Sequence, residues 1–152
     1  MSVISNPLSS FAATSDYRTG LADNGTTHVY GGKETAMFRA NATITVGQVL
    51  TFVVPTAANP LSVTPSTSVT TLCAGVAETA GSAGDLVRVC TSGNTFVVLG
   101  GTVAAGGVIG GGSSAKATAV TVDASTLAGA VLGFALAGGD ADEIVPAYIS
   151  KR

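Results

Sequence analysis

From about residue 42 onward, short runs rich in β-branched residues alternate with stretches rich in Gly, Ser and Asn. Val and Thr favour extended backbone and Gly permits tight turns, so this pattern predicts many short strands. The predicted strands are residues 42–55, 69–78, 85–90, 95–101, 117–123, 130–137 and 143–149. Short strands at this spacing indicate an all-β body, either a small barrel or a sandwich.

Turn residues separate these runs. The sequence TSGN, residues 91–94, predicts a hairpin turn between two strands. PTAANP (55–60) and GGVIGGGSSAK (106–116) predict longer loops. Gly110, Gly112 and Ala115 fit the dinucleotide-binding spacing G-x-G-x-x-A. No helix pattern or β-α-β unit surrounds them, which favours a flexible loop over a phosphate site.

One phrase occurs twice. GVAETAGSAGDLVRV, residues 75–89, aligns without a gap to GFALAGGDADEIVPA, residues 133–147, which lies 58 residues later. Each copy has an apolar strand end, a turn of small residues, and an acidic residue that opens a second apolar run. We therefore predict two similar strand–turn–strand units at equivalent corners of one barrel.

Residues 1–40 differ from the remainder, residues 41–152. They have no sustained hydrophobic period, several turn sequences, and four of the eight aromatic residues. We interpret them as an extended arm that packs on its own barrel or on a neighbouring protein. Aromatic and Arg side chains carry much of the energy at interfaces. The candidate contact residues, with packing on the chain's own barrel as the alternative, are Phe11, Tyr17, Arg18, Tyr30 and Phe38.

The composition limits the partners. Charged residues make up 11% of the 152 residues, against about 25% in an average domain. The net charge is −2 and the seven basic residues are scattered, so we expect no nucleic-acid partner. The apolar runs are too short and too rich in Gly to span a bilayer, and the N-terminus lacks the pattern of a secretory signal. A surface so poor in charge is often covered by a protein partner.

The order LCAGVAETAGSAGDLVRVCTSGNTFVVLGGTVAAGGVI, followed by VLGFALAGGDADEIVPAYI, resembles the head-decoration or capsid cement proteins of tailed bacteriophages. The resemblance covers roughly residues 46–149. It implies a β-barrel or β-tulip body that sits on the outer surface of the virion capsid and stabilises the shell, after assembly in the host cytoplasm. It also implies two partners, the major capsid protein and sister subunits in a homotrimer. In this family an N-terminal arm orders against the capsid protein, and the arm here is longer than in simple members.

Candidate chemistry is sparse, and we expect no enzyme, cofactor or metal. His28 lies in the arm without a recognisable nucleophile motif. The sequence GDADE, residues 139–143, offers oxygen ligands for calcium, with a solvated turn as the alternative. Cys73 and Cys90 would face each other across a hairpin if its turn is centred on Gly81 and Ser82. They could then form a disulfide or remain two buried thiols. A reducing cytosol favours the thiols.

Two other functions are alternatives to the structural role. A head-fibre or tail-associated β-module that binds host-surface glycans is the main alternative, and the aromatic content of 5% argues against it. A small hydrolase is the third, and the sequence contains no paired catalytic constellation for it.

Overall fold

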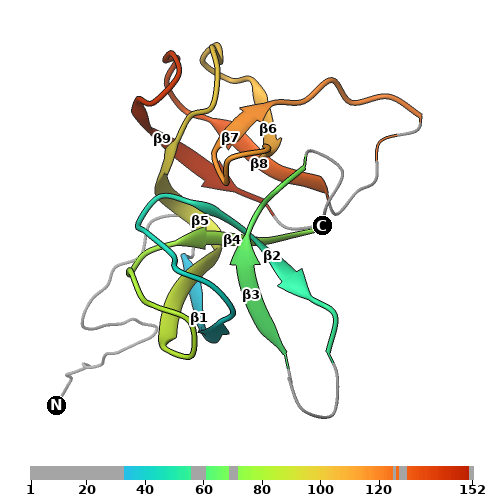
Figure 1. The fold of residues 1–152 in the computed structure, drawn as a ribbon. Coiled ribbons are helices and arrows are strands. Elements are labelled where there is room, and N and C mark those ends of the chain that lie inside the picture. The colour runs from blue at the N-terminus through green and yellow to red at the C-terminus, as the bar shows by residue number, and fades with distance from the viewer. Residues whose placement is uncertain (1–32, 56–60, 69–71, 125, 127–129, 151–152) are drawn as a thin grey trace, which may run out of the picture. The chain divides into compact units, whose positions relative to one another are not determined.

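The structure of the protein is a computed structural model that describes residues 33–55, 61–68, 72–124, 126 and 130–150. Apart from Lys33, these residues belong to one compact unit, Glu34–Arg152. The predicted all-β fold is confirmed (Figure 1). The strands in the described ranges are β1 (Glu34–Ala40), β2 (Val49–Val53), β3 (Ser62–Pro65), β4 (Cys73–Ala77), β5 (Leu86–Val98), β6 (Val108–Gly111), β7 (Ala117–Ala119), β8 (Val131–Ala135) and β9 (Ile144–Ile149). No helix in these ranges is long and apolar enough to cross a bilayer.

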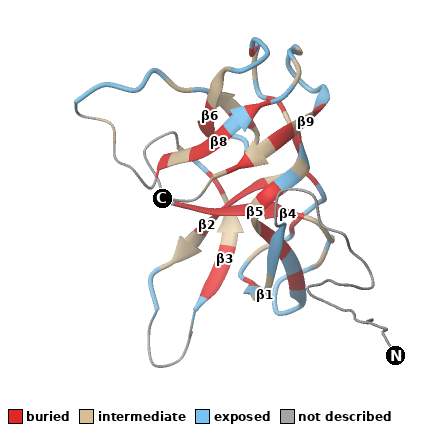
Figure 2. Cartoon of the chain, turned by 180° about the vertical axis from the view of Figure 1, so that it is seen from behind, coloured by how far each residue is buried: buried red, intermediate tan, exposed pale blue. Residues whose placement is uncertain are grey.

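β9 alternates between buried and more exposed side chains, as expected for a strand with one face on a core. In β9, Val145, Ala147 and Ile149 are buried while the residues between them are not. β4 is instead buried at every position. Figure 2 shows the alternation in β9 as red segments separated by tan ones. Hydrogen bonding orders the strands β1-β3-β2-β4-β5-β9-β8-β6-β7.

The first five strands close into what we call the N-terminal barrel. Its sheet, β1-β3-β2-β4-β5, closes because β1 also pairs with the first half of β5, from Thr35 opposite Cys90 to Arg39 opposite Leu86. β1 runs parallel to β3, and the other neighbours are antiparallel. Residues 34–40, which were predicted from the sequence to end the arm, therefore form a strand of the barrel wall.

The second half of β5 opens a second unit, which we call the C-terminal barrel. Here β5 pairs with β9, from Gly93 opposite Ile149 to Val98 opposite Ile144, and the sheet continues through β8 and β6 to β7. A parallel bridge between Leu99 and Ala117 joins the end of β5 to β7. β5 thus ends one barrel and begins the next, and Figure 1 shows it between the two groups of strands.

The two barrels repeat one another, which explains the repeated phrase in the sequence. Ile44 and Gly81 exchange backbone hydrogen bonds of 2.8 and 3.0 Å, and Val103 and Gly139 exchange an equivalent pair of 2.9 and 3.0 Å. The predicted strand–turn–strand repeat is confirmed as the β4–β5 and β8–β9 hairpins. The repeat also reaches further than predicted, because β1 corresponds to the second half of β5, β2 to β6 and β3 to β7.

The cores of the two barrels are equivalent position by position, but equivalent positions often hold side chains of different size. At two positions Ala is replaced by Leu, and at two others Val is replaced by Ala. These pairs are Ala40 and Leu99, Ala74 and Leu132, Val63 and Ala117, and Val89 and Ala147. The gains and losses of volume offset each other, so both barrels remain filled although their sequences have diverged.

Two turn predictions are wrong. The TSGN segment does not turn, because Ser92 pairs with Glu34 of β1 while Asn94 pairs with Tyr148 of β9, which keeps β5 extended from one barrel into the other. Gly93 supplies the left-handed backbone, with φ of +100°, at this passage.

The second wrong prediction is the flexible loop at residues 106–116, which includes strand β6. Ile109 is fully buried, and its glycine neighbours permit close approach of other backbone segments. A Cβ at Gly110 would overlap the backbone oxygen of Ala130, and one at Gly111 would overlap the Ser66 side chain. The glycines therefore serve packing between strands and between barrels.

Candidate functional site

The outer side of the C-terminal barrel carries an apolar face across β5, β9 and β8. Antiparallel pairing sets Phe96 opposite Pro146 and Phe134 opposite Tyr148. The rings of Phe134 and Tyr148 stack with centroids 5.5 Å apart and planes inclined by 21°. Phe96 is 63% exposed and Phe134 is 39% exposed. In Figure 2 the exposed tip of β8 stands out in pale blue. Large aromatic side chains exposed side by side are typical of binding surfaces.

The apolar face continues along the strand ends. Ile144 lies opposite Val98, and its side chain is exposed. Leu136 is also exposed, and its N–H donates to the carbonyl oxygen of Pro146 at 2.8 Å. No charged residue occurs in β8, in β9 or in the second half of β5, residues 93–98.

A cavity of about 340 Å³ opens beside Phe134. Its lining is mostly apolar and consists of Val108, Val122, Thr126, Val131, Gly133, Phe134 and Ser150. The Thr126 hydroxyl accepts a hydrogen bond from the Asp123 N–H at 3.0 Å. A site of this character is suited to an apolar side chain of a partner.

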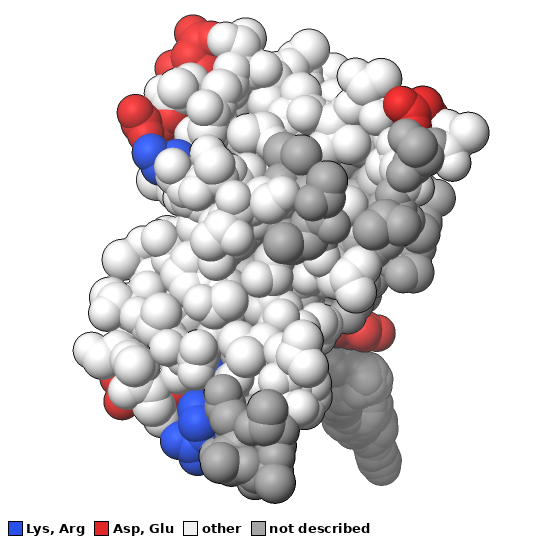
Figure 3. Space-filling view, turned by 45° about the vertical axis from the view of Figure 1, so that its right-hand side comes forward, with Lys and Arg blue, Asp and Glu red and all other residues white. Residues whose placement is uncertain are grey.

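The equivalent face of the N-terminal barrel mixes charged residues with exposed Met37 and Leu86, which are the counterparts of Phe96 and Ile144. The counterparts of Val98, Leu136 and Pro146 in the repeat are Arg39, Glu78 and Arg88. The guanidinium of Arg39 donates to the carbonyl oxygen of Gly84 at 2.7 Å. On the side of the molecule seen in Figure 3, charged side chains gather toward the two ends, and most of the surface between them is uncharged. One barrel therefore has an uncharged outer face where the other carries three charged residues among apolar ones.

The carboxylates of the β8–β9 turn are engaged in hydrogen bonds. Thr102 donates its hydroxyl to Asp140 at 2.8 Å, and the Lys116 ammonium pairs with Asp142. Asp142 has a left-handed backbone with φ of +70°. Within the described ranges, no group of three or more His, Cys, Asp or Glu side chains is placed to hold a metal ion. These contacts stabilise the turn.

One of the five predicted contact residues, Phe38, lies within the described residues, and the other four lie outside them. Phe38 lies in β1, where its half-buried ring packs edge-on against Phe52 with centroids 5.5 Å apart. This is the alternative arrangement considered from the sequence, packing on the chain's own barrel. The remaining candidates lie outside the described residues, as does His28, and their roles stay predictions: Phe11, Tyr17, Arg18 and Tyr30.

Cys73 and Cys90 are buried and form no disulfide, so the prediction of two buried thiols is confirmed. They do not face each other as predicted, because Val76 lies opposite Cys90 and the hairpin is centred beyond Gly81. Burial raises the pKa of the Cys73 thiol, and a hydrogen bond with the Gly111 backbone opposes this in part. A raised pKa lowers the thiolate fraction and the reactivity of the sulfur.

The aromatic face was missed from the sequence. Phe96, Phe134 and Tyr148 each lie inside a predicted strand, so their outward orientation depended on which alternate positions were buried. One pattern in the sequence could have indicated this face: the large residues Ile144, Pro146 and Tyr148 occupy every second position, beside buried Val145. Large apolar side chains on both faces of a strand indicate that both faces meet protein.

The class defined by this fold is an all-β protein made of two repeated barrels that share one long strand. No protein-family model matches the chain, and no curated protein matches it in sequence. Among solved structures, the fold is similar to the N base of the head fiber protein gp8.5 of bacteriophage phi29. The TM-score is 0.60 at 20% sequence identity, and the match covers 79% of this chain and 96% of that chain.

Proposed function

We propose that this chain is a structural protein of a tailed-phage head that attaches to the outside of the capsid shell and stabilises it. The observation that carries the proposal is its likeness in fold to the phi29 head fiber base, which extends over most of both chains. The resemblance of its sequence to capsid cement proteins points to the same place in the virion. The role is adhesive: the protein has structural partners and needs no catalytic residue or cofactor.

The apolar face supports adhesion. Burial of apolar surface stabilises a complex by about 25 cal/mol per Å². Complete burial of Phe96, which is now 63% exposed, would contribute on the order of 1–2 kcal/mol. The partners we propose are the major capsid protein and sister subunits in a homotrimer, without nucleic acid or membrane.

The N-terminal arm adds a second attachment. Phe11, Tyr17, Tyr30 and Arg18 are suited to ordering against the capsid protein, at a cost in conformational entropy. Both the arm and the barrels would then hold the shell, so deletion of residues 1–20, which leaves β1 in place, should weaken attachment without unfolding the barrels.

A second candidate function is the base of a head fibre that carries a module for binding host-surface glycans. The similarity to a protein described as a head fiber base favours it specifically. Both functions require attachment to the shell. They differ in copy number, because a cement protein covers repeated lattice positions and a fibre base need not occupy all of them.

Titration of purified protein onto phage heads stripped of it tests the proposal. Bound copies are counted after sedimentation, and shell stability is measured as DNA release on heating. Cement activity predicts saturation at a whole-number ratio to the capsid protein and a higher release temperature. Binding without a change in release temperature would favour the fibre base, and no binding would contradict both functions.

A further inference from the structure

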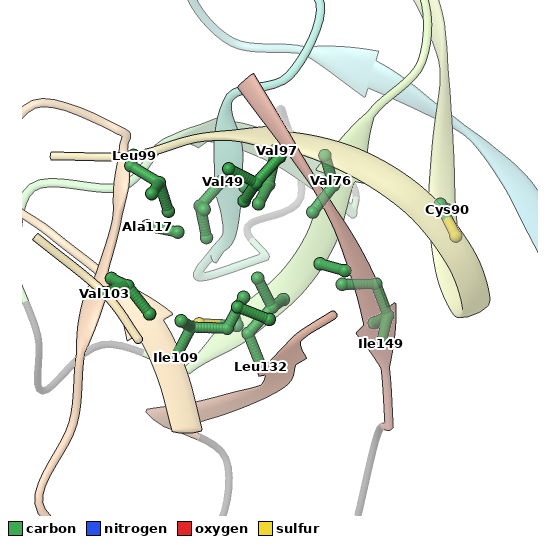
Figure 4. Close-up of a cluster of buried hydrophobic side chains, with 14 residues drawn as sticks. Val49, Val76, Cys90, Val97, Leu99, Val103, Ile109, Ala117, Leu132 and Ile149 are labelled. Carbon is green, nitrogen blue, oxygen red and sulfur yellow. The ribbon is translucent and has the colours of Figure 1, made fainter. Parts of the chain in front are cut away.

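The contact between the two barrels of one chain involves the outer side of β2, β4 and β5 in the N-terminal barrel. Four apolar residues there, each at most 7% exposed, join the core cluster of the C-terminal barrel (Figure 4): Val49, Cys73, Val76 and Cys90. In Figure 4, Val49 and Val76 lie beside Val97, which belongs to the second half of β5. Backbone bonds fix this contact, with the Val49 N–H donating to the Ala115 oxygen at 2.7 Å.

The repeat gives these four residues counterparts in the C-terminal barrel. Val49 lies opposite Val76 as Val108 lies opposite Phe134. Val76 lies opposite Cys90 as Phe134 lies opposite Tyr148. The complete set of counterparts, which we call the Phe134 surface, is Val108, Val131, Phe134 and Tyr148. All four are apolar or aromatic and none is buried, and three of them border the cavity of about 340 Å³ or form part of its wall.

The other side of the barrel contact also has exposed counterparts. The C-terminal barrel contributes Val97, Gly111 and Ala130, which are all buried. Ala130 accepts a hydrogen bond from the Cys73 thiol at 3.7 Å, and a Cβ at Gly111 would overlap Ser66. Their counterparts in the N-terminal barrel, which we call the Leu72 surface, are Phe38, Phe52 and Leu72.

The Leu72 surface is apolar and partly exposed. Leu72 is 57% exposed, and Phe38 and Phe52 are half-buried. Two further exposed apolar residues lie next to β2 and β3 in the chain. Val54 directly follows β2, and Leu61 directly precedes β3. Each chain therefore displays both halves of a contact that it already makes once internally, with larger side chains in each half.

We propose that the Phe134 surface of one copy binds the Leu72 surface of a second copy, head to tail, as a repetition of the contact between the barrels. The cavity beside Phe134 would receive a large exposed side chain such as Leu72. Because the two surfaces differ, the contact is heterologous, and it closes into a ring when the rotation between copies allows. The inference rests on the proposed association of sister subunits and assigns residues to it.

Light scattering coupled to size-exclusion chromatography of the full chain tests this proposal without capsids. Wild-type protein is expected to exceed the 14.8 kDa of one chain in a concentration-dependent manner. Phe134→Asp and Leu72→Asp should each weaken association at least about tenfold, because each places a charge in an apolar contact. An equimolar mixture of the two variants should form two-chain complexes, since the mixture retains one intact surface of each kind.

Leu86→Asp is the matched control. Leu86 is apolar and 59% exposed, and it belongs neither to the Phe134 surface nor to the Leu72 surface. This variant should associate like wild type. Circular dichroism verifies folding of each variant, and Leu72 lies outside the strands, so its variant tests the contact even if Phe134→Asp is unstable.

Three results would overturn the proposal. Wild-type protein that stays monomeric at every concentration would leave the Phe134 surface to the capsid protein or to residues 1–32. Association unaffected by either Asp substitution would place the contact elsewhere. Failure of the variant mixture to form complexes would exclude a head-to-tail contact. None of these results bears on attachment to stripped heads, which is measured separately.

Discussion

Replacement of Gly133 by Ala tests the packing of the repeated hairpins. Gly133 lies in β8, and an added Cβ would overlap the backbone oxygen of Tyr148 in β9. The same conflict arises at its counterpart Gly75, where the Cβ would overlap the backbone oxygen of Cys90. A backbone atom in a hydrogen-bonded strand cannot rotate away as a side chain can, so the two strands must separate locally.

The size of the effect follows from this geometry. Overpacking against fixed neighbours costs about 2–3 kcal/mol, and a chain of this length loses about 3 °C in Tm per kcal/mol. Gly133→Ala should therefore lower Tm by about 6–9 °C. Gly75→Ala should lower it at least as much, because Gly75 also has a φ of +151°.

Thermal unfolding followed by circular dichroism measures both variants. Gly101→Ala is the control, since no atom lies within 4 Å of the Cβ that it would add, and its Tm should match that of wild type. If Gly133→Ala and Gly101→Ala unfolded at the same temperature, the close approach of β8 and β9 would be refuted.

Three further results are expected. Cys73 and Cys90 should resist alkylation at mildly alkaline pH in the folded protein and react after unfolding, because both are buried and the pKa of Cys73 is raised; rapid labelling of native protein would contradict this burial. Asp142→Gly should leave Tm unchanged or raise it, since its counterpart Gly84 has the same left-handed backbone and the lost ion pair is exposed; a large decrease in Tm would contradict the assigned equivalence. Deletion of residues 1–20 should weaken attachment to stripped heads while circular dichroism stays unchanged; unaltered affinity would exclude a role for this part of the arm.

The hairpin repeat was predictable because its chemistry is local. A small-residue turn and a glycine where two strands approach closely leave few alternatives, so Gly75 and Gly133 retained their spacing from the rest of each hairpin. The first half of each barrel was harder to match, since TITVGQVL (43–50) and TVAAGGVI (102–109) share little beyond Gly47, Gly106 and apolar positions. Their equivalence became visible only in the hydrogen bonds.

The passage of β5 between the barrels could not be read from the sequence. Thr91–Asn94 has the residues of a hairpin turn, but its backbone groups find partners in β1 and β9, and tertiary pairing overrides the local preference. The apolar face could not be predicted from the sequence for a related reason. Phe96 and Phe134 look like core residues until the register places Val97 and Ala135 inside.

The proposed function requires that this protein sit on the outside of a phage head. Cryo-electron microscopy of stripped heads, imaged with and without added protein, tests this location most directly. Added density is expected on the outer surface of the shell, with a shape into which the two barrels fit as a pair. Identical reconstructions with and without the protein, or added density inside the shell, would contradict it.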